Sequence, residues 1–418
     1  MNWIYSFFIF LYTLLLFIVS PFNKKAKLIV QGRKQSFNKL EDKIKKTDKV
    51  AWFHAASLGE FEQGRPLIED FKKENSDYKI LLTFFSSSGY EVRKNYDKAD
   101  IVIYLPSDSK KNVKRFLKLS HPSYAFFIKY EFWYNFIKGA KKSGAKVFQV
   151  SLILRPNQYF FSSFGSWYRK QLKNFDFFFV QNKQTKDLLT SIGFNNAKVT
   201  GDTRFDRVVQ IASEARDFER IREFCQNDKI VLMGSSWGKD EQIMREAIGR
   251  TKSKFKLIIA PHEVHLSHIQ EIMALFPEAI KYSDIKEMDY SNSENKDSIL
   301  IIDSIGILSS LYKYATIAYI GGGFGEGIHN ILEAATFGKP ILFGPNYKKF
   351  REAIDLVEKE GVFSFIETDK LIELIDYLLS DNDYYQKSSD ICQRYISDNK
   401  GACQRILSDI KNFDKLIG

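Results

Sequence analysis

The amino-acid sequence predicts an α/β protein with two Rossmann-like domains that face each other across a cleft. Short runs of β-branched, aromatic and other apolar residues recur after residue 49, and each is followed by a polar stretch with helical character. Strands that alternate with helices are typical of βαβ units and therefore of parallel sheets. A charged, helix-favouring stretch over residues 206–227 lacks such runs and separates two halves of similar size.

The predicted strands fall into one set for each half of the chain. The first set covers residues 50–56, 79–86, 101–106, 124–130, 146–151, 177–181 and 198–200. The second set covers residues 230–235, 256–260, 299–303, 316–321 and 340–343. In open α/β sheets ligands bind at the carboxyl ends of the strands, so the residues that follow these runs are the candidates for chemistry.

The composition supports a folded protein with a negatively charged partner. Of the 418 residues, 44% are hydrophobic and 27% are charged, which allows sizeable cores and argues against disorder. The formal net charge of +11 favours nucleic acid, anionic lipid or a phosphorylated substrate as the partner. The three cysteines form no CxxC pair, so a disulfide framework is not expected and a reducing compartment fits best.

The N-terminus carries an apolar segment followed by a basic one. Residues 3–22 contain no charged side chain and are about long enough to span a bilayer as a helix. Ten Lys or Arg residues follow over residues 24–49, which by the positive-inside tendency places the rest of the chain in the cytoplasm. We therefore expect a membrane anchor at 1–23 and a basic juxtamembrane segment at 24–48; the alternative is a buried helix of the core.

The remaining boundaries follow from the strand pattern. An N-terminal Rossmann-like domain is expected at 49–205, a linker at 206–227 and a C-terminal Rossmann-like domain at 228–395, with a C-terminal helix at 396–418.

The first polar motif follows the first predicted strand. It contains Ser57, Gly59 and Glu60, and the glycine permits a turn in which the backbone approaches a ligand. A carboxylate at this sheet edge can act as general base toward a hydroxyl. The same Ser-x-x-Glu spacing is also an ordinary capping box, and the motif alone leaves both interpretations open.

A glycine-rich motif follows the predicted strand at 316–321. Five glycines, Gly323 among them, lie within seven residues, and a predicted helix with His329, Asn330 and Glu333 comes next. Such a loop exposes backbone N–H groups that suit a phosphate, and Glu333 is expected one helical turn beyond Asn330, where it can accept from ribose hydroxyls. The spacing does not fit GxGxxG, so a dinucleotide fingerprint is not supported. A purely structural glycine loop is the alternative.

Two further strand ends are polar, with Ser235 and Ser236 after one strand and Pro261 and His262 after another. Residues 234–239 are one residue short of a Walker loop, which we therefore reject. The histidines at 262, 265 and 268 miss the HExxH spacing, so neither a metal site nor a cofactor is expected.

In combination these motifs resemble the Kdo transferases, the 3-deoxy-D-manno-octulosonic acid transferases of lipopolysaccharide assembly. The similarity covers nearly the whole chain, and the matching segments are Ser57-x-Gly59-Glu60, Glu131-Phe132-Trp133-Tyr134-Asn135, Thr200-Gly201-Asp202-Thr203-Arg204-Phe205-Asp206, Gly327-Ile328-His329-Asn330-Ile331-Leu332-Glu333 and Gly344-Pro345.

The resemblance implies a GT-B fold and inverting transfer of Kdo from CMP-Kdo to a lipid A precursor, without an essential metal. Glu60 would be the catalytic base. The implied substrate-binding residues are Ser57, Gly59, Glu131, Arg204, Ser235, Ser236, Pro261, His262, Gly323, His329, Asn330 and Glu333. The implied location is the cell inner membrane, with the catalytic domains on its cytoplasmic face and no nucleic-acid partner.

Departures from the family pattern bear on the contacts with the acceptor and with the nucleotide base more than on the reaction class. Lys129-Tyr130 precede Glu131 where the family has Glu-Thr, Tyr134 replaces a proline, and His262 stands where an arginine is usual. The rival interpretations are another membrane-associated GT-B enzyme that uses a UDP-sugar, such as a lipid A disaccharide synthase or a peptidoglycan glycosyltransferase, and a non-catalytic nucleotide-sugar binding module.

Overall fold

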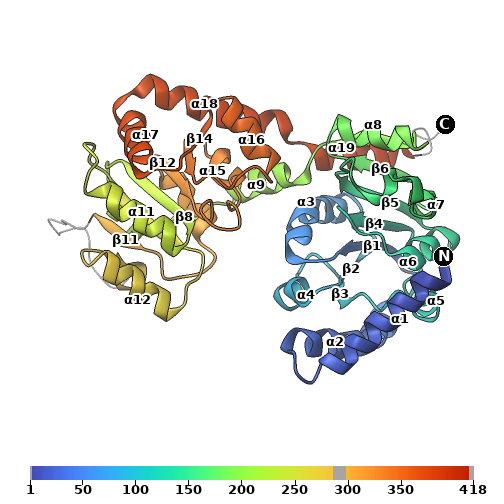
Figure 1. Ribbon diagram of the computed structural model, residues 1–418. Coiled ribbons are helices and arrows are strands. Elements are labelled where there is room, and N and C mark those ends of the chain that lie inside the picture. Colours follow the sequence, from blue (N-terminus) through green and yellow to red (C-terminus); the bar gives the residue numbers. More distant parts are fainter. Residues whose placement is uncertain (1, 286–297, 414–418) are drawn as a thin grey trace. The chain divides into compact units, whose positions relative to one another are not determined.

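The computed structural model describes residues 2–285 and 298–413 and divides the chain into two compact units (Figure 1). Unit 1 comprises Met1–Arg207 and Lys400–Gly418, and unit 2 comprises Val208–Asn399. The predicted linker at 206–227 holds most of α9 (Thr203–Ser213) and all of α10 (Glu219–Cys225).

Unit 1 is built on a seven-stranded parallel sheet in the order β3-β2-β1-β4-β5-β6-β7. Its strands are β1 (Lys49–Ala55), β2 (Tyr78–Phe84), β3 (Ile101–Tyr104), β4 (Tyr124–Ile128), β5 (Lys146–Leu152), β6 (Phe177–Val180) and β7 (Ala197–Val199). Its helices are α1 (Asn2–Val19), α2 (Lys24–Lys43), α3 (Leu58–Glu74), α4 (Ser87–Arg93), α5 (Lys110–Ser120), α6 (Tyr134–Lys142), α7 (Ser166–Leu172), α8 (Lys183–Ser191) and α19 (Ala402–Lys411).

Both faces of this sheet are covered. Successive residues of β1 alternate between them: Trp52 packs in the apolar core on one face and Phe53 in the core on the other, both fully buried. Near-continuous apolar strands are what a parallel sheet with helices on both faces requires. The C-terminal helix α19 packs against α3 and contributes Cys403 and Ile406 to the core of unit 1.

Among the described residues, unit 2 contains a second seven-stranded parallel sheet, in the order β10-β11-β9-β8-β12-β13-β14. Its strands are β8 (Ile230–Ser236), β9 (Lys256–Pro261), β10 (Ile280–Lys281), β11 (Ile299–Ile301), β12 (Ile317–Ile320), β13 (Ile341–Phe343) and β14 (Val362–Ser364). Besides α10, its helices are α11 (Gly238–Ile248), α12 (Leu266–Leu275), α13 (Tyr282–Ile285), α14 (Leu308–Leu311), α15 (Leu332–Thr336), α16 (Arg351–Glu358), α17 (Thr368–Ser380) and α18 (Asn382–Asn399).

The predicted fold class is confirmed: the chain is an α/β protein with two Rossmann-like parallel sheets. Every predicted run overlaps an observed strand, with ends that differ by a residue or two. Strands β10 and β14 were not predicted, because two- and three-residue strands leave almost no periodic signal.

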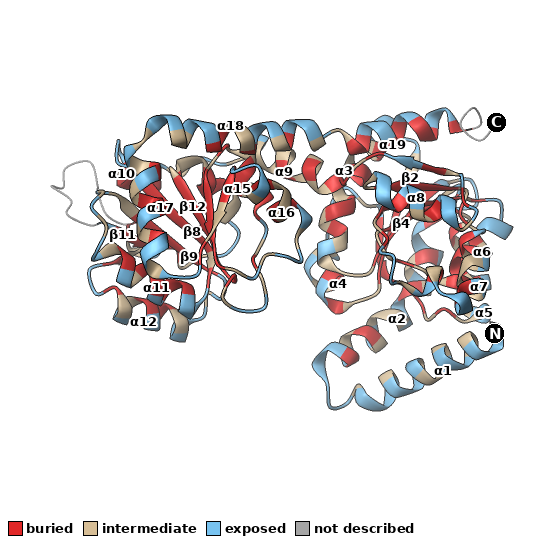
Figure 2. Ribbon diagram, turned by 45° about the horizontal axis from the view of Figure 1, so that its top comes forward, coloured by how far each residue is buried: buried red, intermediate tan, exposed pale blue. Residues whose placement is uncertain are grey.

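The N-terminal helix α1 exposes many of its apolar side chains. Trp3, Phe7 and Phe8 are more than half exposed, so α1 is not the buried core helix that was the alternative to an anchor (Figure 2). In the described chain, no single helix is both long and apolar enough to cross a membrane; α1 and α2 satisfy that length and composition test only as a pair bent by 116°.

Candidate active site

Glu60 lies in the first turn of α3, directly beyond the carboxyl end of β1, an interior strand of the sheet. Ser57 is the N-cap of α3 and accepts a long hydrogen bond, 3.5 Å, from the backbone N–H of Glu60. The Glu60 carboxylate in turn accepts from the backbone N–H of Ala56 at 2.7 Å. Ser57 therefore caps α3, but Glu60 bonds the N–H of the residue before the cap and not that of Ser57, as a capping box would require. The Ala56 hydrogen bond holds the carboxylate at the edge of the sheet.

The surroundings of Glu60 favour proton uptake. Burial raises the pKa of the Glu60 carboxyl, and the negative charge of Glu131 raises it further; the Ala56 hydrogen bond and the His54 and Lys129 side chains act in the opposite direction. A carboxylate with a raised pKa holds a transferred proton better than an exposed glutamate. The site can therefore provide a general base.

Glu131, whose charge acts on Glu60, belongs to a buried polar network with His54 and Trp133. The Trp133 indole N–H donates to Glu131 Oε2 at 2.6 Å, and His54 Nε2 lies 3.2 Å from the same oxygen. On its other side, His54 Nδ1 lies 2.8 Å from Thr83 Oγ1, which also accepts from the Trp52 indole. Since both ring nitrogens are engaged, the network fixes the imidazole and through it the Glu131 carboxylate.

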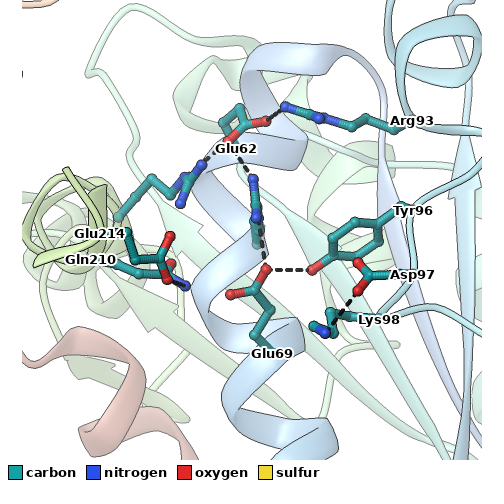
Figure 3. Close-up of polar contacts among 10 residues, drawn as sticks. Glu62, Glu69, Arg93, Tyr96, Asp97, Lys98, Gln210 and Glu214 are labelled. Atoms are coloured by element: carbon teal, nitrogen blue, oxygen red, sulfur yellow. Dashed lines mark hydrogen bonds and ion pairs between the residues drawn. The ribbon is translucent and has the colours of Figure 1, made fainter. Parts of the chain in front are cut away.

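Helix α3 is also held from its outer side, through residues after Glu60. Glu62 pairs with Arg93 at 2.6 Å, and Glu69 accepts from the Tyr96 hydroxyl at 2.8 Å (Figure 3). These contacts tie α3 to α4 and to the segment that follows it. The helix that carries Glu60 is thus positioned at several points along its length.

The other predicted residues of unit 1 have different surroundings. Gly59 is exposed, and a Cβ there would meet no atom within 4 Å, so local packing does not require a glycine. Arg204 donates through Nε to Asp202 Oδ2 at 2.8 Å, and Gln63 donates to the other oxygen of Asp202, also at 2.8 Å. Asp202 thereby holds Arg204 against α3.

In unit 2 the glycine-rich loop after β12 is a tight backbone structure. A Cβ on Gly321 would lie 2.1 Å from the Ser235 carbonyl oxygen, and Gly322 and Gly327 have φ angles of 88° and 142°. Asp240 organises the loop: its carboxylate accepts from the Gly322 N–H at 3.0 Å and from the Tyr319 hydroxyl at 2.8 Å. Among the described residues, the buried Gly323 offers a backbone N–H that has no hydrogen-bond partner.

Three aromatic rings stack beside this loop. The His262 ring stacks on both Trp237 and His329, with centroid distances of 4.7 and 4.3 Å, while the centroids of Trp237 and His329 are 6.3 Å apart. The Trp237 indole donates to His329 Nε2 at 3.0 Å. Burial lowers the pKa of His329 to about 4, and the neighbouring His262 contributes, so His329 is neutral at pH 7 with its proton on Nδ1.

Ser236 and Pro261 lie at the paired ends of β8 and β9. The buried Ser236 hydroxyl donates to Glu241 Oε1 at 2.8 Å, which ties this sheet edge to α11. Ser235, just before it, has a φ of 54°, a left-handed conformation unusual for a serine.

The prediction that His329 and Asn330 lie on a helix is wrong. Helix α15 begins only at Leu332, because the Asn330 side chain accepts from the Leu332 N–H and ends the loop there. Asn330 and Glu333 nevertheless meet: the Asn330 amide donates to Glu333 Oε1 at 3.0 Å. No cluster of three or more metal-ligating side chains occurs in the part of the chain that the structure describes.

Sequence reasoning overlooked His54, Trp237 and Asp240. A buried histidine inside an apolar strand carries no local signal for its partners on β2 and in the loop after β4. Asp240 did have a local signal, because an acidic residue three positions after the residue that precedes a helix is typical of a helix start. Its carboxylate accepts a hydrogen bond from the Trp237 N–H at 3.0 Å.

The chain is similar in sequence to known Kdo transferases. Residues 31–207 match the family model described as 3-Deoxy-D-manno-octulosonic-acid transferase (kdotransferase), a range that lies entirely in unit 1. The 3-deoxy-D-manno-octulosonic acid transferase of Chlamydophila psittaci is 26% identical over 381 residues, 88% of this chain and 86% of that protein. The chain carries a Kdo transferase domain. The resemblance seen in the motifs is thus confirmed, and the protein is a glycosyltransferase.

Two further similarities bear on the Kdo transferase domain and its fold. A bifunctional glycosyltransferase/methyltransferase of Fusobacterium nucleatum is 28% identical over 396 residues, 85% of this chain and 60% of that protein. A crystal structure of a UDP-N-acetylglucosamine 2-epimerase from Listeria monocytogenes has a TM-score of 0.61 at 15% identity, covering 88% of this chain and 97% of that chain. At that identity the likeness shows the two-sheet fold alone.

Proposed function

We propose that the protein transfers Kdo from CMP-Kdo to a sugar hydroxyl of a lipid A precursor, with inversion and with Glu60 as general base. The observation that carries this proposal is the position of Glu60. Its carboxylate sits at the carboxyl end of β1 with one oxygen on the Ala56 N–H, and burial and Glu131 raise its pKa. The family match over residues 31–207 includes this segment.

The proposed step is a single displacement. The acceptor hydroxyl oxygen attacks the anomeric carbon of Kdo, its proton goes to Glu60, and the bond from the anomeric carbon to the phosphate oxygen of CMP breaks. The Gly323 N–H, which has no hydrogen-bond partner among the described residues, and the neighbouring Gly-rich backbone suit the phosphate of the leaving CMP. The neutral His329, with its proton on Nδ1, can add a further donor.

The remaining predicted residues take supporting roles in this proposal. Ser235, Ser236, Pro261 and His262 line the strand ends where the nucleotide would bind, and the hydrogen-bonded Asn330 and Glu333 would meet the ribose. In unit 1, Ser57, Gly59 and Glu131 surround the base, and Arg204 would meet an acceptor phosphate or the Kdo carboxylate.

We also propose that the enzyme works at the cytoplasmic face of the inner membrane. The exposed aromatic side chains of α1 and the lysines of α2 form the combination of apolar and basic surface that anionic bilayers attract. Within this proposal, α1 serves as the anchor predicted at 1–23.

Nucleotide preference tests the donor directly. CMP should raise the melting temperature of the purified protein, because a ligand that binds the folded state stabilises it. UDP at the same concentration should not, and this separates the proposal from the UDP-sugar alternative. A rise with UDP and none with CMP would overturn the proposed donor.

A further inference from the structure

A lysine-rich groove runs between α5 and α6 in unit 1, and its lining includes Tyr134 and Asn135 at the start of α6. The cavity has a volume of about 600 Å³. Five lysines line it: α5 contributes three at intervals of four residues, and α6 contributes two at the same interval, namely Lys110, Lys114, Lys118, Lys138 and Lys142. Side chains four residues apart share one helix face, so the two stripes border a single groove.

In the part of the chain that the structure describes, no acidic side chain pairs with the lysines of the groove. All five lysines are exposed, and none has an ion pair or side-chain hydrogen bond with any described residue. Their neighbours behave differently: Lys141 pairs with Asp176, and Arg115 pairs with Glu41. Unpaired cations gathered on facing helices indicate an anionic ligand.

Part of the groove lining is apolar and aromatic, beside the polar Asn135, Ser143 and Gln171. Val113 and Leu117 of α5 lie along it, and Tyr5, Tyr134 and Trp167 form one end. These three rings pack edge to face or tilted, with centroid distances from 4.5 to 5.9 Å. A site for a simple anion needs no such apolar lining. An amphiphile fits both surfaces of the groove, because its charged head can lie among the lysines and its hydrocarbon chain against the apolar side chains.

Helix α1 connects this groove to an exposed apolar surface. Tyr5 of α1 lines the groove, and its hydroxyl donates to the buried carboxylate of Asp108 at 2.6 Å, which fixes the helix at the groove's end. Farther along α1, Phe8 and Phe10 are 60% and 63% exposed. An apolar helix beside a cationic groove is typical of a surface that lies against a bilayer.

We propose that the groove binds one anionic phospholipid of the bilayer, with the head-group phosphate among the five lysines and an acyl chain over Val113 and Leu117. This binding does not depend on the identity of the sugar donor or on Glu60. It would place unit 1 against anionic lipid through a defined site in addition to the general attraction of basic segments.

The test uses dihexanoyl phosphatidylglycerol below its critical micelle concentration, titrated calorimetrically into the full-length protein. Saturable binding is expected, with at least tenfold weaker binding of dihexanoyl phosphatidylcholine and of inorganic phosphate. Replacing all five groove lysines by Gln should weaken phosphatidylglycerol binding at least tenfold. Replacing them by Arg should preserve it, since Arg keeps the charge.

A matched control removes five exposed lysines that do not line the groove and should leave lipid binding unchanged: Lys183→Gln, Lys186→Gln, Lys229→Gln, Lys252→Gln and Lys254→Gln. The proposal is overturned if the groove Gln variant, with a melting temperature like that of the control variant, binds phosphatidylglycerol as tightly as the native protein does. Equal affinity for phosphatidylcholine, or for inorganic phosphate, would equally contradict an anionic phospholipid site.

Discussion

The Glu60 carboxylate accepts a 2.7 Å hydrogen bond from the backbone N–H of Ala56, one residue before the N-cap of α3. This bond reconciles two interpretations of the Ser-x-x-Glu motif. The Oε2 atom of Glu60 accepts the hydrogen bond at the start of the helix. The Oε1 atom accepts no hydrogen bond from any described residue. A residue can therefore act as a cap and still present a base to a substrate.

Glu60→Gln separates these two roles. The amide oxygen of Gln can still accept from the Ala56 N–H, so the melting temperature should change little. Transfer should fall about 10²- to 10⁴-fold, because the amide cannot take up the acceptor proton. The measurement is kcat for Kdo transfer beside a thermal melt of the same preparation.

Glu62→Gln is the matched control on the same helix. Glu62 pairs with Arg93 at 2.6 Å and with Arg207 at 2.9 Å, so its loss should lower stability by about 2 kcal/mol or less while retaining most of the activity. Normal turnover by Glu60→Gln would reduce Glu60 to a helix cap.

Glu131→Gln should shift the pH dependence of transfer. The negative charge of Glu131 raises the pKa of Glu60, so removing that charge should lower the pKa of the base. A base must be deprotonated to act, and the acid limb of the kcat/KM profile should therefore move to lower pH. An unmoved limb, or a move to higher pH, would contradict electrostatic coupling between these carboxylates.

Gly321→Ala should weaken nucleotide binding at least tenfold. A Cβ at this position would lie 2.1 Å from the Ser235 carbonyl oxygen, so the backbone at the end of β8 or in the loop must move. Gly325→Ala is the control in the same loop, because the nearest atom to its Cβ would be 3.7 Å away. Equal CMP affinities for the two variants, measured by calorimetry, would show that the loop does not hold the nucleotide.

Asp108→Asn should change how stability depends on pH. Burial raises the pKa of Asp108 to about 7, so between its ordinary pKa and that value the folded state binds more protons than the unfolded state. The contribution of Asp108 to stability is therefore fully present near pH 3.8 and is lost as pH rises through about 7.

The asparagine variant lacks this titration, and urea unfolding at a series of pH values measures the difference. The free energy of unfolding of the native protein, minus that of the variant, should decrease from pH 4 to pH 8. Parallel curves for the two proteins would mean that Asp108 titrates at its ordinary pKa in the fold.

The alternation of apolar runs and helical stretches was enough to predict both sheets, because buried parallel strands are nearly continuous in hydrophobicity. Strands β10 and β14 were not predicted, because they are too short to show a hydrophobic period. The start of α15 was misplaced for a different reason: the side-chain hydrogen bond from Asn330 to the Leu332 N–H delays the helix, and a helix-favouring sequence does not reveal that competition.

The site was predictable only where its residues are adjacent in sequence. Ser57 and Glu60 form a local motif, and the glycines after β12 indicate a loop. The contacts of His54 with Thr83 and Glu131, and of Asp240 with Gly322, join residues that are 29 to 82 positions apart. Such pairs arise from the order of strands in the sheet, which local pattern does not encode.

The central claim is tested most directly by giving the purified full-length protein a lipid A precursor and freshly generated CMP-Kdo. We expect a Kdo-extended lipid and one CMP released for each Kdo transferred, with product formation strongly reduced in Glu60→Gln. No product from the native enzyme with CMP-Kdo, together with consumption of a UDP-sugar under the same conditions, would contradict it.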